Sequence, residues 1–475
     1  MLEGLKAHWS RSLSLTFFFF FLTLAVYYLT SPGPTPYNSP VHLGAALLEG
    51  RLDVPNGDVL ATYMDFAVYK GKYYIVEPPM TSIVMLPGIL LFGTALNQTA
   101  VSIIIGGITA SSVYQLTRRL TEKLSVQVWL TLLFVFGTIY WYHTVDGAVT
   151  DIAHALATLF LVLAIYATLV SKQPFFAGLL LGAAYWTRPP TVLALAFFII
   201  MFADQWLPKS NDKSLLKRID LRPLAQLGFG LGIFVVLSFA YNYLRFDTIE
   251  PVSYSIYIEH YREVLGPSAP DWSKGVFNTA YIHGHIRELL QPTPVFLSDP
   301  AYVVPAYAGL AIWVTTPAFL YTLFAGIRSK LVIVLGSAAL LVTLTIFILS
   351  SRGLPHRLDL DFPLGLDFYP FGFLIVFSLL AGIRNKLIIA CWLAIIPIAL
   401  IQFLYGHTPF QFGYRFSLDY YPFLFLLTAI VIGDKIKWHH MFLITLSIMV
   451  NLWGVMWLHN FRLDDFLGWQ WLAFG

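Results

Sequence analysis

Residues 13–30 read LSLTFFFFFLTLAVYYLT. This run carries no charged side chain, and as a helix rising about 1.5 Å per residue it crosses most of a hydrocarbon core about 30 Å thick. Lys6 and Arg11 precede it, but no small-residue cleavage pattern follows. We therefore interpret the run as a first membrane helix rather than a removable signal peptide.

Similar apolar runs recur along the chain, of which 57% is hydrophobic and only 12% charged. This composition excludes an ordinary set of soluble domains. The single cysteine, Cys391, excludes a disulfide framework. We predict one all-α, polytopic transmembrane bundle over residues 1–475 with about 13 spans. The predicted spans are 13–30, 97–117, 125–142, 150–170, 174–187, 190–207, 224–244, 306–326, 331–349, 367–383, 387–404, 419–433 and 440–458.

The charges between these spans are sorted by side. With the N-terminus in the cytoplasm, more than half of the 29 Lys and Arg residues fall in short inner loops, as positive-inside sorting requires. We therefore predict a multi-pass protein of the plasma (inner) membrane whose functional carboxylates face outside. The acids assigned to the inner side are only Glu3, Glu122, Asp204, Asp212, Asp220 and Asp434.

Two predicted outer segments, 31–96 and 245–305, are too long to be simple connectors. Within the first, the apolar runs 41–48 and 80–92 are too short to span a bilayer, so we expect short interfacial helices there. The second segment mixes charges with aromatic side chains, which favours a folded cap over a disordered linker. Its aromatic residues include Tyr254, Tyr257, Tyr261, Trp272 and Tyr281.

Several stretches, taken in order, carry a family resemblance. They are Asn38-Ser39 with Ala45, Leu48 and Gly50; DFAVYKGKYY at 65–74 with Pro78-Pro79; GLLLG at 178–182 with Arg188-Pro189; YNYLRF at 241–246; and FGYRF at 412–416 before Pro422-Phe423. Together they resemble the GT-C superfamily of membrane glycosyltransferases. The resemblance points in particular to bacterial proteins related to the protein O-mannosyltransferases and the lipid A aminoarabinose transferases.

That resemblance implies transfer of a sugar from a polyprenyl-phosphate donor to a glycan, lipid or protein acceptor outside the cytoplasm, usually with inversion. It implies an acidic catalytic residue in the first outer loop and no nucleotide site. We assign no cofactor and no metal. The chain departs from the pattern at Asn38, because many relatives have an acidic residue just after the first helix.

Inverting transfer needs a carboxylate that takes the proton from the acceptor hydroxyl. The first outer segment offers Glu49, Asp53, Asp58, Asp65 and Glu77. We predict Asp65 as the base, with Glu77 next, because Asp65 opens the stretch at 65–74. Lys72 follows closely enough for a folded loop to bring a phosphate-binding cation beside the acid, and Tyr73 suits stacking on a sugar. The structural alternative is that Asp65 only caps or salt-bridges the loop.

The leaving phosphate needs cations or hydrogen-bond donors. Arg188 ends a short predicted span and so lies at membrane depth, where an arginine is costly unless it faces a polar cavity. A guanidinium also matches phosphate oxygens in a bidentate arrangement. Arg245 and Arg415 lie at the ends of other spans, and we predict that all three arginines bind substrate. The alternative is interfacial anchoring by snorkelling side chains.

Three other patterns point to chemistry more weakly. Asp151 and His154 share one helical face, which allows a polarised histidine but is more typical of a helix start. The Asp359-Leu360-Asp361 motif and the His283-Gly284-His285 cluster offer too few ligands to specify a metal.

Two rival functions stay open. A transporter or flippase of a lipid-linked or anionic substrate explains a membrane-buried arginine equally well, but it predicts functional polar groups on both membrane faces. A non-catalytic, lipid-binding assembly subunit accounts for Asn38. The charge pattern indicates no nucleic-acid partner.

Overall fold

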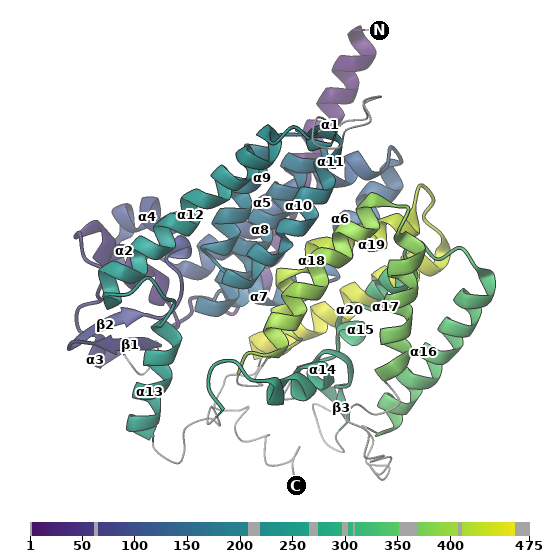
Figure 1. The fold of residues 1–475 in the computed structure, drawn as a ribbon. Coiled ribbons are helices and arrows are strands. Elements are labelled where there is room, and N and C mark those ends of the chain that lie inside the picture. The colour runs from purple at the N-terminus through teal and green to yellow at the C-terminus, as the bar shows by residue number, and fades with distance from the viewer. Residues whose placement is uncertain are drawn as a thin grey trace. The chain divides into compact units, whose positions relative to one another are not determined.

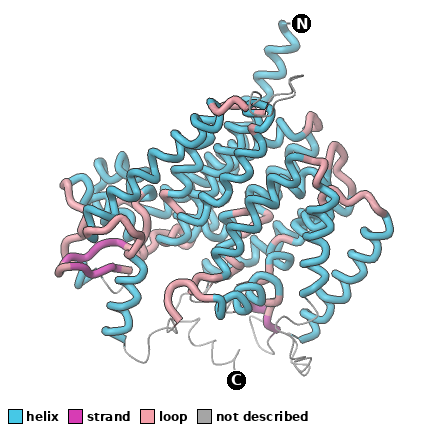
Figure 2. The backbone as a smooth tube through the Cα atoms, in the orientation of Figure 1, coloured by secondary structure: helices cyan, strands magenta, loops and turns pink. Residues whose placement is uncertain are grey.

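A computed structural model describes residues 2–60, 65–207, 219–265, 274–296, 303–306, 309–350, 368–406 and 411–460. The chain forms two compact units, Met1–Ser112 with His143–Asn278, and Val113–Tyr142 with Thr279–Gly475. Helices dominate both units (Figure 1), and the few strands lie in short hairpins (Figure 2).

The first unit holds both candidate carboxylates, Asp65 and Glu77. The elements of the first unit are α1 (Leu2–Thr30), α2 (Ser39–Leu48), α3 (Gly57–Leu60), β1 (Phe66–Tyr69), β2 (Lys72–Ile75), α4 (Met80–Phe92), η1 (Gly93–Ala95), α5 (Gln98–Leu120), α7 (Tyr140–Asp146), α8 (Val149–Leu169), α9 (Pro174–Tyr185), η2 (Pro189–Ala194), α10 (Leu195–Met201), α11 (Ala203–Trp206), α12 (Arg222–Phe246) and α13 (Ser253–Leu265). Some residues of α5 and α7 belong to the second unit.

Helix α9 packs between α8 and α12 in this unit. A Cβ atom added to Gly178 would lie 2.0 Å from the carbonyl oxygen of Leu227, and one added to Gly230 would lie 2.4 Å from that of Phe175. These backbones approach so closely that only glycine fits, as in membrane helix pairs built on small residues. The GLLLG stretch at 178–182 therefore brings the end of α9 beside α12 (Figure 1).

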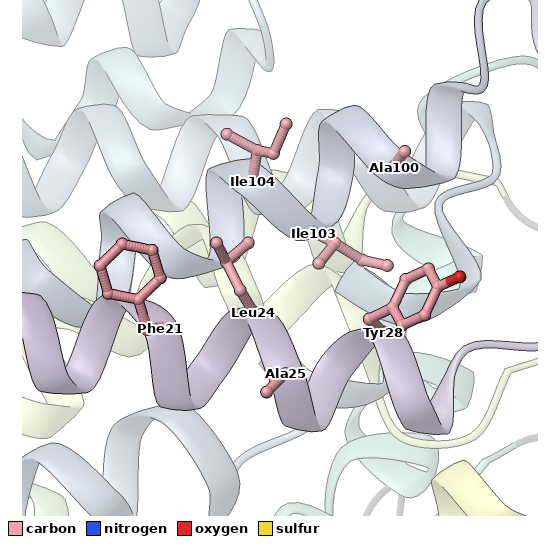
Figure 3. A pocket seen from close by; sticks show the side chains of 7 residues that line it. All are labelled: Phe21, Leu24, Ala25, Tyr28, Ala100, Ile103 and Ile104. Carbon is pink, nitrogen blue, oxygen red and sulfur yellow. The ribbon is translucent and has the colours of Figure 1, made fainter.

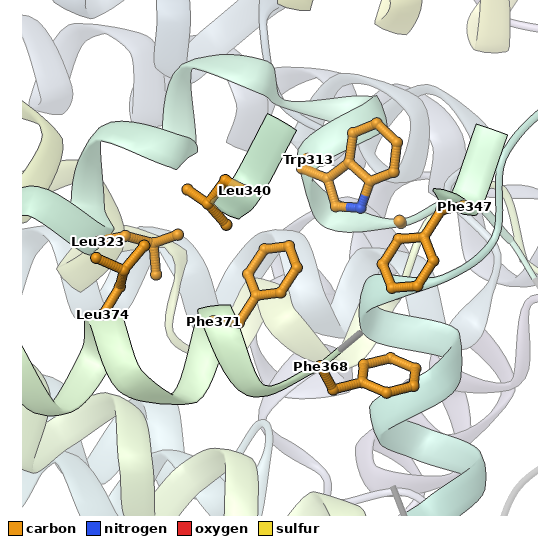
Figure 4. Close-up of a cluster of buried hydrophobic side chains, with 8 residues drawn as sticks. Trp313, Leu323, Leu340, Phe347, Phe368, Phe371 and Leu374 are labelled. Carbon is orange, nitrogen blue, oxygen red and sulfur yellow. The ribbon is translucent and has the colours of Figure 1, made fainter. Parts of the chain in front are cut away.

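The second unit has its own apolar core, where Trp313, Phe347, Phe368 and Phe371 come together (Figure 4). The Trp313 Nε1–H donates to the carbonyl oxygen of Leu290 at 2.7 Å, which ties α14 to α15. The elements of this unit are α6 (Leu124–Phe136), η5 (Thr279–Tyr281), α14 (Ile282–Leu290), β3 (Val295–Phe296), β4 (Val303–Val304), α15 (Ile312–Thr315), η6 (Pro317–Phe324), α16 (Lys330–Ser350), α17 (Tyr369–Gly382), α18 (Lys386–Phe403), η8 (Arg415–Asp419), α19 (Tyr421–Ile432) and α20 (Trp438–Asn460).

The described residues include seven helices long and apolar enough to cross a membrane. The pair α6 and α7, bent by 48°, provides an eighth if it is one span. This confirms a helical chain of multi-pass character, while the count of about 13 stays a prediction. The remaining predicted spans coincide with shorter or broken helices, at 174–187, 190–207, 306–326, 367–383 and 419–433. The seven long helices lie at Leu13–Thr30, Gln98–Leu120, Val149–Ser171, Arg222–Phe246, Lys330–Leu349, Lys386–Phe403 and Trp438–Trp457.

The two long segments differ from the all-α prediction. The predicted short helices are present as α2 and α4, but β1 and β2 form an antiparallel hairpin between them. Strands β3 and β4 pair in the second segment. The strands are too short to stand out in a chain whose apolar pattern is dominated by membrane helices.

Candidate active site

The hairpin turn comes directly from the sequence Lys70-Gly71. Both residues have positive φ angles, 50° and 73°. Two-residue turns with two positive φ angles match the right-handed twist of the strands that they join, and glycine adopts this conformation without a steric penalty. The turn therefore sets the register of β1 against β2.

That register brings Asp65 and Glu77 to the same end of the hairpin, which we call the open end. Phe66 pairs with Ile75. One step further out, the Val76 N–H donates to the Asp65 carbonyl oxygen at 3.4 Å. Glu77 follows Val76, so both predicted carboxylates leave the hairpin together.

The two carboxylates have different environments. Asp65 is exposed, and its Oδ1 accepts a hydrogen bond of 2.9 Å from the Tyr257 hydroxyl. Glu77 is only 9% exposed, and its buried Oε2 has no hydrogen-bond partner among the described residues. Burial, followed by the negative charge of Asp65, raises the pKa of Glu77 to about 8. At neutral pH the pair therefore holds a proton on Glu77.

Arg245, predicted to bind substrate, anchors the hairpin to α12. Its side chain is buried, with 4% of the residue exposed. Nη1 donates to the carbonyl oxygen of Ile75 at 2.9 Å, and Nη2 donates to Asn242 Oδ1 at 3.1 Å. The guanidinium also lies 3.8 Å from the ring centre of Tyr241. These contacts fix the last residue of β2 close to Glu77.

Lys72 and Tyr73 do not lie at the open end. The strand direction puts Lys72 at the turn, four residues along an extended strand from Val76, or roughly 13 Å away. Its Nζ lies 3.7 Å from Asp53, which also contacts Arg51 at 2.8 Å. The expectation that the loop presents Asp65 and Lys72 together is therefore wrong. Tyr73 packs against Phe66, with ring centres 5.6 Å apart.

The charges of Arg51 and Lys72 keep Asp53 ionised. Although partial burial opposes ionisation, the hydrogen bond and charge of Arg51 and the charge of Lys72 together lower the pKa of Asp53 below its usual value. Asp53, a weaker candidate for the base than Asp65 and Glu77, therefore lies in a structural salt bridge.

Arg188 lies at the end of α9, where the chain turns into η2. The Met80 N–H donates to the carbonyl oxygen of Trp186 at 3.4 Å, so this end of α9 contacts the start of α4 just after Glu77. The Trp186 ring also packs on Tyr241, with centres 6.4 Å apart. Arg188 is half-buried and shares this part of the first unit with the open end of the hairpin.

Arg415 belongs to the second unit and begins η8. Its backbone N–H donates to Gln411 Oε1 at 2.9 Å, and its guanidinium lies 5.7 Å from the ring centre of Phe416. The side chain is half-buried.

Asp151 contacts a histidine that the sequence analysis did not select. Its Oδ1 faces Nδ1 of His143, and the ring of His154 lies 6.3 Å from that of His143. Helical spacing allows a pair of Asp151 with His154, although a role at the helix start was the favoured reading. His143 instead comes from α7, beyond the break at Gly147, where the backbone φ is +66°. A contact across such a break has no periodic signal.

Among the described residues, no group of three or more His, Cys, Asp or Glu side chains is placed to hold a metal ion. His285 uses both ring nitrogens within the second unit, with Nδ1 2.8 Å from the Tyr414 hydroxyl and Nε2 2.7 Å from the carbonyl oxygen of Tyr405. Because that carbonyl only accepts, Nε2 carries a proton and donates it. Asp359 and Asp361 lie outside the described residues.

An apolar pocket of about 430 Å³ lies between α1 and α5 (Figure 3). Charged side chains are absent from its lining, so it suits hydrocarbon and carries no chemistry. The lining residues are Phe21, Leu24, Ala25, Tyr28, Ala100, Ile103 and Ile104. The carboxylates at the open end are not among them.

A scan against models of known protein families finds no match for the chain, and a search of curated proteins also finds none. Among solved structures, the chain is similar to the Archaeoglobus fulgidus oligosaccharyltransferase in the apo form, with 13% identity and a TM-score of 0.43. It is also similar to the oligosaccharyltransferase AglB of that archaeon in complex with an inhibitory peptide and a dolichol-phosphate, with 12% identity and a TM-score of 0.45. Each alignment covers 98% of this chain, which spans 60% and 58% of those two proteins. Sequence identities and TM-scores this low do not indicate the activity of the chain.

Proposed function

We propose that the chain is a membrane glycosyltransferase that moves a sugar from a polyprenyl-phosphate donor to a glycan, lipid or protein acceptor outside the plasma membrane. The observation that carries the proposal is the open end of the hairpin, where exposed Asp65 lies beside buried Glu77. Two carboxylates whose environments separate their protonation states are typical of sites that move protons.

The proposed reaction is a direct displacement. Asp65 accepts the proton of the acceptor hydroxyl, whose oxygen forms a bond to the anomeric carbon of the sugar. The bond between that carbon and the lipid phosphate breaks, and the phosphate leaves with the electron pair, so the anomeric configuration inverts. Glu77 keeps its own proton at neutral pH because burial and the negative charge of Asp65 raise its pKa to about 8, so we propose Asp65 and not Glu77 as the base.

For the leaving phosphate we propose Arg188 first, because the end of α9 contacts the chain just after Glu77. Arg415 belongs to the second unit and stays a sequence-based candidate for substrate binding. Lys72 is the weakest, because it bridges to Asp53 at the turn. We assign Arg245 and Tyr73 to holding the hairpin in place, on the contacts described above.

The test is sugar transfer by the purified full-length protein in nanodiscs, offered a panel of polyprenyl-phosphate sugars with membrane glycolipid and cell-wall acceptors. Wild type, Asp65→Asn and Glu77→Gln are compared with Asp247→Asn, a matched control that removes an exposed carboxylate near the turn. We expect transfer by wild type, Glu77→Gln and the control, and none by Asp65→Asn.

Two results would contradict the proposal in different ways. Full transfer by a correctly folded Asp65→Asn variant would exclude Asp65 as the base. Saturable binding of a donor without turnover by wild type would instead favour a lipid-binding subunit or a transporter.

A further inference from the structure

The second long segment holds the hairpin at its turn. Asp247, the first residue after α12, accepts hydrogen bonds from Lys70 Nζ at 2.7 Å and from the Tyr69 hydroxyl at 3.2 Å. Asp247 adopts a left-handed backbone conformation with φ of 57°, which ends α12 and turns the chain toward the hairpin. The second long segment therefore contacts the hairpin first at the Lys70-Gly71 turn.

The same segment holds the open end through α13, which packs on β1. Val252 and Ile256 contact the small apolar cluster that includes Ala67 and Val76. The Ser253 hydroxyl donates to the carbonyl oxygen of Val76 at 3.2 Å. Val76 is the residue immediately before Glu77, so α13 is fixed directly beside the carboxylate pair.

Tyr257 extends this contact to Asp65 itself. It lies one helical turn after Ser253, so both side chains project from the same face of α13. Its hydroxyl donates to Asp65 Oδ1 at 2.9 Å. A hydrogen bond to an ionised carboxylate is charge-assisted, which makes it shorter and stronger than a hydrogen bond between neutral groups.

We propose that Tyr257 is a positioning residue, which orients the Asp65 carboxylate for proton transfer. The inference rests on the proposed function and deepens it by assigning a role to the second long segment. Because the Tyr257 hydroxyl bonds to the charged form of Asp65, its removal raises the pH at which that carboxyl becomes protonated.

Other groups near the hairpin also bear on the titration of Asp65. Glu77 leaves the same end of the hairpin, and its ionisation opposes that of Asp65. Besides Tyr257, the titratable and charged groups on the elements packed against the hairpin include Tyr241, Tyr243 and Arg245 of α12, Asp247 after it, and Tyr254, Glu259, His260, Tyr261, Arg262 and Glu263 of α13. The test therefore removes the Tyr257 hydroxyl and leaves the other groups in place.

The experiment follows Asp65 directly in the full-length protein in nanodiscs. A water-soluble carbodiimide with an amine nucleophile labels protonated carboxyl groups, and mass spectrometry of the peptide that contains Asp65 gives the labelling rate at each pH. Wild type is compared with Tyr257→Phe and with Ser253→Ala, which loses a hydrogen bond of the same helix but none to Asp65. We expect the midpoint to rise by about 0.5–1 pH unit in Tyr257→Phe and to stay in place in Ser253→Ala.

The same three proteins, with Asp65→Asn, are then assayed for sugar transfer from the donor panel as a function of pH. In Tyr257→Phe, the acid limb of the transfer profile is expected to shift with the labelling midpoint. An unchanged labelling midpoint would overturn the role of Tyr257 whatever the activity. A shifted midpoint with full transfer by Asp65→Asn would overturn the base assignment and the positioning role with it.

Discussion

The two ends of one short hairpin carry opposite kinds of charge arrangement. At the turn, acids contact bases: Lys70 bridges to Asp247, and Lys72 and Arg51 bridge to Asp53. At the open end, two acids lie together, and one of them is buried. Surface ion pairs hold a loop in place at small energetic gain, whereas two neighbouring carboxylates are costly and persist where they have a use.

These two charge arrangements indicate which charged residues of the first long segment to test for chemistry. In the sequence, Asp53 and Lys72 are charged residues of the same segment as Asp65 and Glu77. Only the neighbours that each side chain acquires on folding separate a structural pair from a candidate catalytic pair.

The largest expected effect concerns activity. Replacement of the base, Asp65→Asn, removes the group that accepts the proton and should lower the rate of sugar transfer by about 10²–10⁴-fold. The turn-end variant Asp53→Asn should retain transfer within a few-fold, because its carboxylate only pairs with Arg51 and Lys72. Equal losses in the two variants, measured on folded protein, would remove the distinction between the two ends.

The next effect is on the pH dependence of stability. Because the pKa of Glu77 is raised from 4.5 to about 8 in the folded protein, the folded state binds a proton that the unfolded state releases. The stability that this proton contributes is therefore fully present below about pH 4.5. It is lost as the pH rises to about 8, and the loss is on the order of 5 kcal/mol as an upper bound.

Glu77→Gln is the matched variant for this pH effect, since the amide resembles the neutral acid and cannot ionise. Its thermal midpoint should equal that of wild type near pH 4.5 and exceed it increasingly toward pH 8.5. Parallel curves for the two proteins across this range would show that Glu77 is not held protonated.

A smaller loss is expected when the hairpin anchor is removed. Arg245→Met leaves the carbonyl oxygen of Ile75 buried without its donor, which costs about 1–3 kcal/mol of stability. Arg245→Lys keeps the charge but loses the planar group that reaches both Ile75 and Asn242, so it should lie between wild type and the methionine variant. Thermal unfolding of the three proteins in nanodiscs checks this order of stabilities. An unchanged thermal midpoint in Arg245→Met would contradict the anchoring role.

The smallest effect is expected at the exposed pair of the turn. Lys70→Met and Asp247→Asn break a salt bridge of 2.7 Å that is open to solvent and screened by salt. Neither variant should measurably change the thermal midpoint or the rate of transfer, in low or high salt. A loss comparable to that of Arg245→Met would show that both ends of the hairpin are equally critical.

Much of the architecture is readable along the chain. The spans from 13–30 and 224–244 appear as long helices because sufficient apolar length is a local property that needs no distant partner. The first outer segment supplies Asp65 and Glu77 as candidates together with Glu49, Asp53 and Asp58, and Asp65 is preferred because it opens the stretch at 65–74 that carries the family resemblance. The proximity of Asp65 and Glu77 was not predicted, since it depends on a strand register set by the Lys70-Gly71 turn.

Contacts between distant residues lay beyond that local information. Tyr257 meets Asp65 across 192 positions, and Arg245 meets Ile75 across 170. Nothing in the spacing of either residue reports its partner, and Lys72 shows that closeness in the chain does not ensure closeness in space. Hydropathy and charge therefore decide which segments enter the membrane, while the packing of α12 and α13 against the hairpin decides which acids become a site, because burial and electrostatic environment exist only once the chain has folded.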